Sequence, residues 1–277
     1  MSEDADAAAE AVEQMQADAE AALQEGDVVA GIIQAGDLRA YLGTLQSLVA
    51  EAKLHLSSDG LNVSAVEPGN VAMFQECSLA ARRFEHLEAP GQAVVGIAIP
   101  TLLDRLGPAA DGDLVDLRLN MDTRRLELSY RTIEQSVALI DPDAIRSEPD
   151  DPDMELPNTV VVEGRQFAEA VEVADQLSGH LTITTDPDER EVRITAEGDT
   201  DSAAVAWADE DVIDADVSEQ TVTKLSTEFL TDMVSPIPDA AEVTLRLGDE
   251  FPIRIKYDAL EGAMHVHQML APRISSQ

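Results

Sequence analysis

The sequence predicts an α+β protein of two similar domains, each a pair of β-α-β-β-β units in which antiparallel sheets present one face to two helices. Three observations lead to this prediction. Helix-like segments recur four times at a regular period, alternating strand-like segments fill the intervals, and a proline-rich segment divides the chain near its middle. At 277 residues the chain is long enough for two domains with cores of their own.

Apolar residues at helical spacing mark the four helices, and each set forms one face. The sets are Leu38, Tyr41, Leu42, Leu45, Leu48 and Val49; Leu102, Leu103 and Leu106; Phe167, Ala170, Val171, Ala174 and Leu177; and Phe229, Leu230 and Met233. Gly36-Asp37, Pro100 and Ser226 are typical of helix starts. The helices begin near residues 37, 100, 165 and 226, so the separations are 63, 65 and 61 residues. This period indicates one supersecondary unit used four times.

The segments between the helices alternate as half-buried strands do, with every second residue on a core face. The first strand, VVAGIIQ, starts at Val28. The clearest later ones are LVDLRLN (114–120), RRLELSYR (124–131), EVRITAEG (191–198), EVTLRLG (242–248) and PIRIKYD (252–258). Each unit is therefore predicted to run strand, helix, three strands.

The segment Ile140 to Pro157 has four prolines and seven carboxylates, and it suits neither a helix nor an inner strand. We expect an extended, exposed connector there. The predicted organisation is an acidic N-terminal tail (1–27), an N-terminal domain (28–139), the connector (140–157) and a C-terminal domain (158–277). The tail is rich in alanine and acid, and we expect it to be frayed or weakly docked.

The charge balance restricts the possible functions. Acids outnumber bases 55 to 18, giving a formal charge of −37, which argues against a protein that holds nucleic acid through a basic surface. The only lysines are Lys53, Lys224 and Lys256. This acid-rich, lysine-poor surface indicates a halophile; an ordinary solubilising surface is the alternative. The lone Cys77 excludes an intramolecular disulfide. With no apolar run of membrane length, a soluble cytoplasmic protein is expected.

Five short motifs give the chain a specific resemblance. They are EPGNVAM (67–73), ALIDPDAIRSEP (138–149), AEGDTDSA (196–203), DEFPIRIKY (249–257) and MLAPRI (269–274). With the connector and the fourfold repeat, the chain from Val28 to Ile274 resembles the DNA sliding clamps of the proliferating cell nuclear antigen family, and its composition suggests a haloarchaeal member. MLAPRI by itself would be weak support.

The resemblance implies a homotrimeric ring whose helices line a central hole around duplex DNA, with the sheets outside. Such a processivity factor needs no nucleophile, metal or cofactor, so no enzyme is expected. Its implied partners are double-stranded DNA, two further copies of itself, DNA polymerase, a clamp loader, flap endonuclease, ligase and other proteins with a clamp-binding peptide motif.

The resemblance also implies a partner pocket beneath the connector and beside the C-terminal segment. It would accept a short motif with a glutamine, an aliphatic residue and two aromatics. The corresponding residues are Val66, Asn70, Val71, Met73, Ile145, Pro149, Pro252, Leu270, Ala271, Pro272, Arg273 and Ile274. By residue type alone, Val66, Val71 and Met73 would be ordinary core.

Two further sets follow from family position. The DNA-facing residues would be Arg39, Gln46, Arg105 and Arg165. Relatives usually carry lysine at Gln46, Pro108 and Ser235, and many carry arginine at Glu169, Glu172 and Glu228, so the lining of the hole is depleted of bases. The subunit interface would pair segment 125–131 with segment 190–198 of the next subunit, using Leu126, Leu128, Tyr130, Val192, Ile194 and Ala196.

The remaining candidates are weaker. His265 and His267 alternate on one strand and could share a metal, but exposed strand histidines are the simpler interpretation. Asp150, Asp151 and Asp153 resemble a cation loop in a chain where acids are common. Cys77 is expected to be a buried small hydrophobe. Two alternatives to a clamp stay open: a clamp-fold scaffold without a DNA role, and a carboxylate-dependent enzyme, for which no catalytic motif is found.

Overall fold

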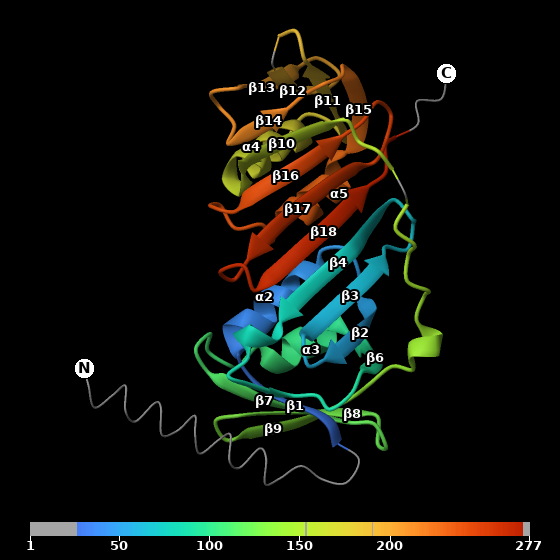
Figure 1. Cartoon of the computed structure of the whole chain (residues 1–277), viewed down its shortest axis with the longest axis vertical. Helices are drawn as coiled ribbons and strands as arrows, with labels where there is room; N and C mark the ends of the chain where they lie inside the picture. Colours follow the sequence, from blue (N-terminus) through green and yellow to red (C-terminus); the bar gives the residue numbers. More distant parts are fainter. Residues whose placement is uncertain (1–26, 153, 190, 274–277) are drawn as a thin grey trace, which may run out of the picture. The chain divides into compact units, whose positions relative to one another are not determined.

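The structure, a computed structural model, describes residues 27–152, 154–189 and 191–273 (Figure 1). The expectation for the acidic tail (1–27) therefore lies outside the described residues except at its last position, and the expectation for Ile274 lies outside them as well. None of the described helices is long and apolar enough to cross a membrane.

The predicted fourfold repeat of strand, helix and three strands is confirmed. The first unit of the repeat is β1 (Asp27–Gln34), α2 (Ala35–Gln46), β2 (Glu51–Ser57), β3 (Gly60–Val66) and β4 (Ala72–Ala80). The second is β6 (Ala93–Ala98), α3 (Ile99–Leu106), β7 (Leu114–Asn120), β8 (Arg125–Tyr130) and β9 (Ile133–Ala138). The third is β10 (Asn158–Glu163), α4 (Gly164–Asp175), β11 (His180–Asp186), β12 (Glu191–Glu197) and β13 (Ser202–Ala208). The fourth is β15 (Thr221–Ser226), α5 (Thr227–Val234), β16 (Glu242–Leu247), β17 (Ile253–Ala259) and β18 (Met264–Leu270).

Short elements that the sequence did not predict lie between these. A three-residue strand follows the first and the third unit of the repeat, as β5 (His86–Glu88) and β14 (Asp214–Asp216). Two 3-10 turns, Ala81–Arg83 and Pro142–Ala144, complete the described elements. Ser226 does precede α5, but its side chain makes no capping hydrogen bond, so the start of this helix depends on its buried face instead.

The described residues form two compact units, each larger than one repeat, and from here on "the first unit" and "the second unit" mean these two. The first contains 27–43, 50–63 and 78–146, and the second contains the other described residues. The strands β3 and β4 contribute residues to both. The domain boundaries at 28–139, 140–157 and 158–277 stay a prediction.

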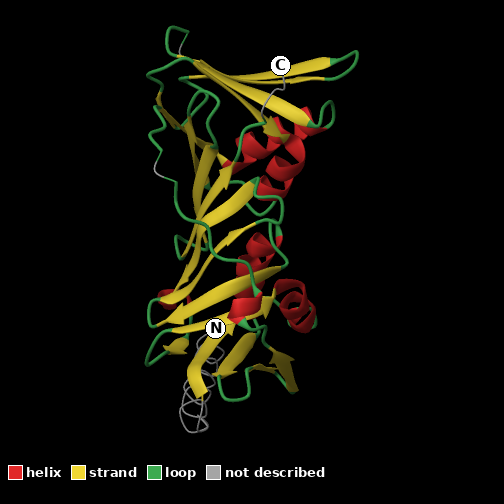
Figure 2. Cartoon of the chain, turned by 90° about the vertical axis from the view of Figure 1, so that its right-hand side faces the viewer, coloured by secondary structure: helices red, strands yellow, loops and turns green. Residues whose placement is uncertain are grey.

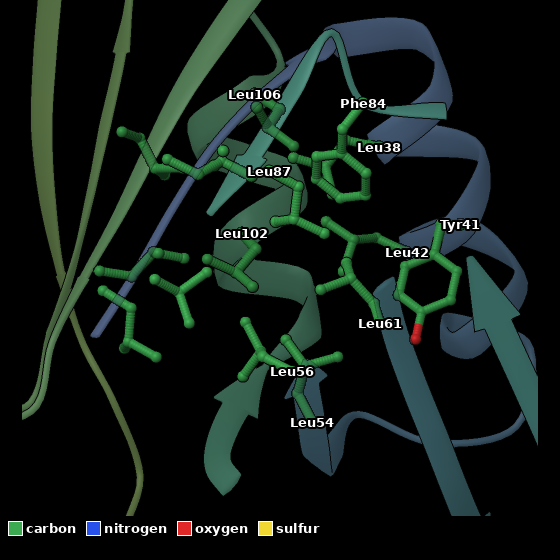
Figure 3. A pocket seen from close by; sticks show the side chains of 16 residues that line it. Leu38, Tyr41, Leu42, Leu54, Leu56, Leu61, Phe84, Leu87, Leu102 and Leu106 are labelled. Atoms are coloured by element: carbon green, nitrogen blue, oxygen red, sulfur yellow. The ribbon is translucent and has the colours of Figure 1, made fainter. Parts of the chain in front are cut away.

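The first unit has a five-stranded antiparallel sheet in the order β5-β1-β7-β8-β9, and β2 pairs with β3 and β6 in another sheet. Leucines from both sheets meet leucines of α2 and α3 in its core (Figure 3). In the second unit, β13-β12-β11-β15 form a four-stranded sheet. The strands β14-β10-β16-β17-β18 lie in another sheet, in which residues 72–77 of β4 are the next neighbour of β18. The helices α4 and α5 lie side by side in this unit (Figure 2).

The core of the first unit contains an apolar cavity of about 50 Å³, and Gly31 is one of the residues that line it. Gly31 lies four residues before the first residue of α2, and the corresponding residues before the other helices are Val95, Val160 and Thr223. The glycine therefore omits a branched side chain that the other three repeats carry. Phe84 and Leu87 fill part of that space, because a Cβ on Gly31 would lie 3.3 Å from one and 3.4 Å from the other. The space that is left is a packing defect, too small for a cofactor.

Partial filling of this cavity should stabilise the first unit. Val29 lines it, and Val29→Ile adds one methylene group at the wall. Since cavities cost about 24 cal/mol per Å³, we expect the free energy of unfolding to rise by about 0.5–1 kcal/mol. The matched control is Val160→Ile, at a fully buried valine that does not line the cavity, which should destabilise by about 1 kcal/mol or more through overpacking. Guanidinium denaturation measures both, and equal effects would contradict this account.

Candidate functional site

The EPGNV motif forms a turn that Glu67 holds together. The Glu67 carboxylate is buried and accepts hydrogen bonds from the backbone N–H groups of Gly69 and Val71, both at 2.5 Å. The N–H of Asn70 donates to the Glu67 carbonyl at 3.1 Å, and Asn70 takes the left-handed conformation with φ of 61°. Asparagine tolerates this region better than other non-glycine residues, so the motif encodes the turn. Sequence reasoning missed the role of Glu67, although a carboxylate before Pro-Gly-Asn is a signal for such a turn.

The C-terminal segment lies beside this turn. The N–H of Ala271 donates to the Val71 carbonyl at 2.8 Å, and the N–H of Arg273 donates to the Lys224 carbonyl at 2.7 Å. Residues 271–273 therefore connect the turn to β15 within the second unit. Ala271 and Pro272 are half-buried, whereas Leu270 is fully buried in the core. The Leu270 side chain thus packs in the core and is not available at the surface.

Several predicted pocket residues share an intermediate exposure in the second unit. They are Val66, Val71, Met73, Pro149 and Pro252. On β4, Met73 alternates with the buried Ala72 and Phe74, so its side chain lies on the outer face of the strand. Half-exposed apolar side chains of this kind are what a docking groove for a peptide requires. We use the name partner groove for the predicted site made of the Glu67–Met73 turn, Pro149, Pro252 and residues 271–272; its role in binding stays a prediction.

Ile145 has a different environment. It belongs to the first unit, where its Cδ1 lies 2.7 Å from the position that a Cβ on Gly96 would take. Ile140 also pairs with Gly96 through two backbone hydrogen bonds of 2.8 and 3.1 Å. The first part of the connector is therefore attached to β6, which explains why Ile145 is half-buried. Its place in a partner pocket stays a prediction.

The predicted DNA-facing residues divide into two kinds. Gln46, Arg105 and Arg165 are exposed. Arg39 instead donates to the carbonyls of Leu106 and Ala109, each at 2.9 Å, and forms an ion pair with Asp111. Its guanidinium holds the loop after α3 against α2.

The exposed faces of α4 and α5 carry more acidic than basic side chains; whether they line a hole stays a prediction. Arg165 is paired with Glu169 at 2.8 Å, and Glu172 and Glu228 are exposed. Partial burial raises the pKa of Asp232, and the neighbouring carboxylates of Glu228 and Asp175 raise it further. These helices therefore offer few positive charges to phosphates.

The predicted pairing between subunits through β8 and β12 is wrong. In its own chain β8 already pairs with β7 and β9, and β12 pairs with β11 and β13. Neither strand has a free edge. The side chains chosen for that interface lie mostly in the core of the single chain: Leu128, Tyr130, Val192, Ile194 and Ala196 are buried, and Leu126 is half-buried. The prediction rested on family position, and in each sheet one further strand, β9 or β13, lies outside the strand it named.

Two of the outer strands are covered by the chain itself. The edge of β6 is occupied by Ile140, and the edge of β15 by Arg273 and by Glu250, whose N–H donates to the Val222 carbonyl at 3.1 Å. Among the described residues, no strand pairs with the outer edge of β9 or of β13. These are the two long edges that remain available to another chain.

The minor candidates have structural explanations. His265 Nδ1 lies 2.7 Å from Asp258 Oδ1, and His267 Nδ1 lies 3.6 Å from Glu76 Oε2. Burial lowers the pKa of His267, and the positive charge of Lys256 lowers it further. Within the described part of the chain, no cluster of three or more possible ligands could hold a metal. Cys77 is buried, as predicted, and burial raises the pKa of its thiol.

Comparison with known proteins places this architecture. No family model matches the chain. A protein named DNA polymerase sliding clamp from Natronomonas pharaonis is 43% identical over 88% of this chain and 98% of its own length. Its namesake from Halobacterium salinarum is 41% identical over the same shares. A solved A. fulgidus PCNA with the C-terminal region of FEN-1 bound is 29% identical and superimposes with a TM-score of 0.83, covering 90% of this chain and all of that one.

The fourfold repeat and the likeness to the solved PCNA define a clamp-type protein. The chain belongs to the family of DNA polymerase sliding clamps. The predictions of a sliding clamp rather than an enzyme, and of a halophilic archaeal member, are thereby confirmed, since these relatives come from haloarchaea.

The turn at Asn70 gives a test of the groove's local structure. Asn70→Val places a β-branched residue at positive φ and should lower the free energy of unfolding by about 1–2 kcal/mol. Asn70→Gly accepts this conformation and should change it by less than about 0.5 kcal/mol. Guanidinium denaturation in molar salt would compare the two, and an equally stable Asn70→Val protein would show that the turn has another conformation.

Proposed function

We propose that three copies of this chain close into a ring that encircles duplex DNA and tethers polymerase and other DNA-processing enzymes. The observation that carries the proposal is the pair of open edges, β9 on the first unit and β13 on the second. One edge on each unit allows a head-to-tail contact in which β9 of one copy pairs with β13 of the next. Repeated head-to-tail contacts form a ring when the rotation between copies closes. The proposed number of copies in the ring, three, is taken from the resemblance to the proliferating cell nuclear antigen family.

The composition of β13 supports this pairing. The strand Ser202–Ala208 contains no charged residue, in a chain with a formal charge of −37. Free edges of soluble proteins usually carry charges that prevent pairing, and β13 lacks them. Val173 of α4 is 40% exposed and forms a shallow apolar hollow with Ala203 and Val205 of this strand. A neighbouring copy would bury both features.

Enclosure explains how a chain so poor in bases can hold DNA. Counterion release makes charge-based DNA affinity fall steeply with salt, and the screening length is about 3 Å at 1 M. A basic lining would therefore contribute little in a salt-rich cell. A closed ring stays on DNA by topology, whatever the charge of its helices.

The partner groove is the proposed attachment site for enzymes. The C-terminal region of FEN-1 is bound to A. fulgidus PCNA, which supports a flap endonuclease among the partners here. We expect polymerase, clamp loader and ligase to use peptides of the same kind, with apolar anchors against Val71, Met73 and Pro252 and backbone pairing beside residues 271–273.

The decisive experiment measures topological retention on DNA. The chain would be loaded on nicked circular DNA with a clamp loader, in molar salt, and the DNA would then be linearised by a restriction enzyme. An encircling ring stays on the circle and slides off the linear form. Equal retention on both forms would show that the protein binds DNA without encircling it. No loading while partner peptides still bind would favour the clamp-fold scaffold.

A charge in the proposed subunit contact should separate the copies. Val173→Glu changes a side chain that is exposed in the single chain, so the fold should persist while the trimer dissociates at least about tenfold more readily. Val222→Glu is the matched control, because Val222 is 45% exposed and lies on the covered edge β15. Light scattering in molar salt gives the mass of each. If Val173→Glu keeps the trimer mass, the contact lies elsewhere.

The exposed arginines of the helices should matter mainly at low salt. Replacing Arg105 and Arg165 with glutamate should reduce clamp-stimulated DNA synthesis several-fold in dilute salt and little in molar salt, since screening removes the charge term while enclosure remains. Arg39 is unsuitable for this test because it holds the loop after α3. An equal loss at both salt concentrations would indicate close, unscreened contacts with DNA.

A further inference from the structure

The second part of the connector is attached to the sheet of the second unit. Arg254 of β17 donates from its guanidinium to the Asp151 carboxylate at 2.8 Å and to the Pro152 carbonyl at 2.6 Å. The side-chain amide of Gln75, on β4, donates to the same Asp151 oxygen. We call Arg254, Gln75, Asp151 and Pro152 the Arg254 clasp. All four residues belong to the second unit.

The burial of Arg254 makes this attachment strong. Its side chain is only 12% exposed, and both recorded acceptors of the guanidinium come from the connector. The Nε donor is buried without an acceptor. If the connector lifted away, a largely buried positive charge would lose both of its partners, which is far more costly than losing an exposed ion pair. Asp151 itself is 66% exposed, so its carboxylate contributes less to this preference. The largely buried Arg254 is the main reason why the connector stays attached to the sheet.

A second contact holds the connector four residues further on. Arg246, opposite Arg254 on the neighbouring strand β16, donates to the Leu156 carbonyl at 3.1 Å. Leu156 is 3% exposed, and its Cδ2 lies 2.9 Å from the position that a Cβ on Gly248 would take. The connector therefore crosses the outer face of this sheet between two arginines, in a chain with only 18 basic residues.

The clasp adjoins the partner groove on two strands. On β4, Gln75 follows Met73 by two residues and lies on the same face. Arg254 follows the groove residue Pro252 by two positions, and Asp151 follows Pro149 by two. The hydrogen bonds of Asp151 thus hold the segment that carries Pro149 close to β4 and β17.

We propose that Arg254 is a positioning residue for partner binding: it fixes the connector so that the wall of the groove is formed before a partner peptide arrives. This rests on the proposed function of the groove. A preformed wall avoids the entropic cost of ordering the connector during binding, and that saving appears as affinity. Arg254 need not touch the peptide to have this effect.

The test combines two measurements on the full-length chain in molar potassium chloride. Hydrogen–deuterium exchange of segment 147–156 without peptide reports whether the connector is held. Titration of a fluorescent peptide with a glutamine, an aliphatic residue and two aromatics reports the groove. Arg254→Met should raise exchange in this segment and weaken peptide binding about tenfold, which corresponds to about 1.4 kcal/mol. Arg254→Lys, which keeps the charge but loses the planar fork, should lie between Arg254→Met and the parent.

The matched control is Arg193→Met. Arg193 is also a strand arginine paired with a carboxylate, Glu191 at 2.7 Å, and no hydrogen bond recorded for it reaches the connector. It should leave exchange and affinity unchanged. A purely structural role for Arg254 would lower the denaturation midpoint but leave the affinity of the folded protein as it was.

The outcomes separate this inference from the proposed function. Unchanged exchange in Arg254→Met would show that the clasp does not hold the connector, and raised exchange with unchanged affinity would show that the groove does not depend on it. Either result overturns the inference while peptide binding by the parent protein still supports the proposed function. If the parent protein does not bind the peptide at all, the proposed partner groove fails, and with it the role of Arg254 in partner binding.

Discussion

Every open antiparallel sheet has two edge strands with a row of unpaired backbone groups each. Much of this structure can be understood from which of these edges the chain covers and which it leaves unpaired. Ile140 covers the edge of β6, and the turn before β17 and Arg273 cover that of β15. Ile140 belongs to the connector and Arg273 to the C-terminal segment, and these two stretches also contribute Pro149 and residues 271–272 to the proposed partner groove. The same stretches thus cover sheet edges and contribute to the proposed docking site. Among the described residues, no strand pairs with the outer edges of β9 and β13, and we propose that another copy does so.

The second constraint is charge. With 55 acids and 18 bases, carboxylates outnumber the basic side chains about threefold. Several arginines act inside the structure rather than on its surface. Arg83 pairs at 2.6 Å with Asp37, whose side chain is 10% exposed, and Arg39 and Arg246 donate to backbone carbonyls. Contacts to carbonyls and to shielded carboxylates lose less strength in concentrated salt than exposed ion pairs do. These three arginines are thus placed where screening is weak.

Sequence patterns and structure agree where the interaction is local. The helices at Ala35–Gln46 and Gly164–Asp175 begin within two residues of the predicted starts, because apolar spacing and the preceding turns are encoded in adjacent residues. The EPGNV turn is likewise local, since Glu67 bonds to N–H groups two and four positions away. The pairing predicted for β8 rested on family position, and it failed because β9 lies outside β8 in the same sheet, which the sequence of β8 does not show.

By itself the sequence determined the fourfold repeat, the two-part organisation and the motifs that placed the chain among the sliding clamps. Periodicity, turn chemistry and composition are properties of neighbouring residues, so one chain is enough to read them. Only the tertiary structure decided which strands end a sheet, that Arg39 braces a loop, and that Arg254 meets Asp151 across 103 positions of sequence. Those facts depend on which distant segments become neighbours. A charged residue in an acid-rich chain has many possible partners, and only the fold selects one.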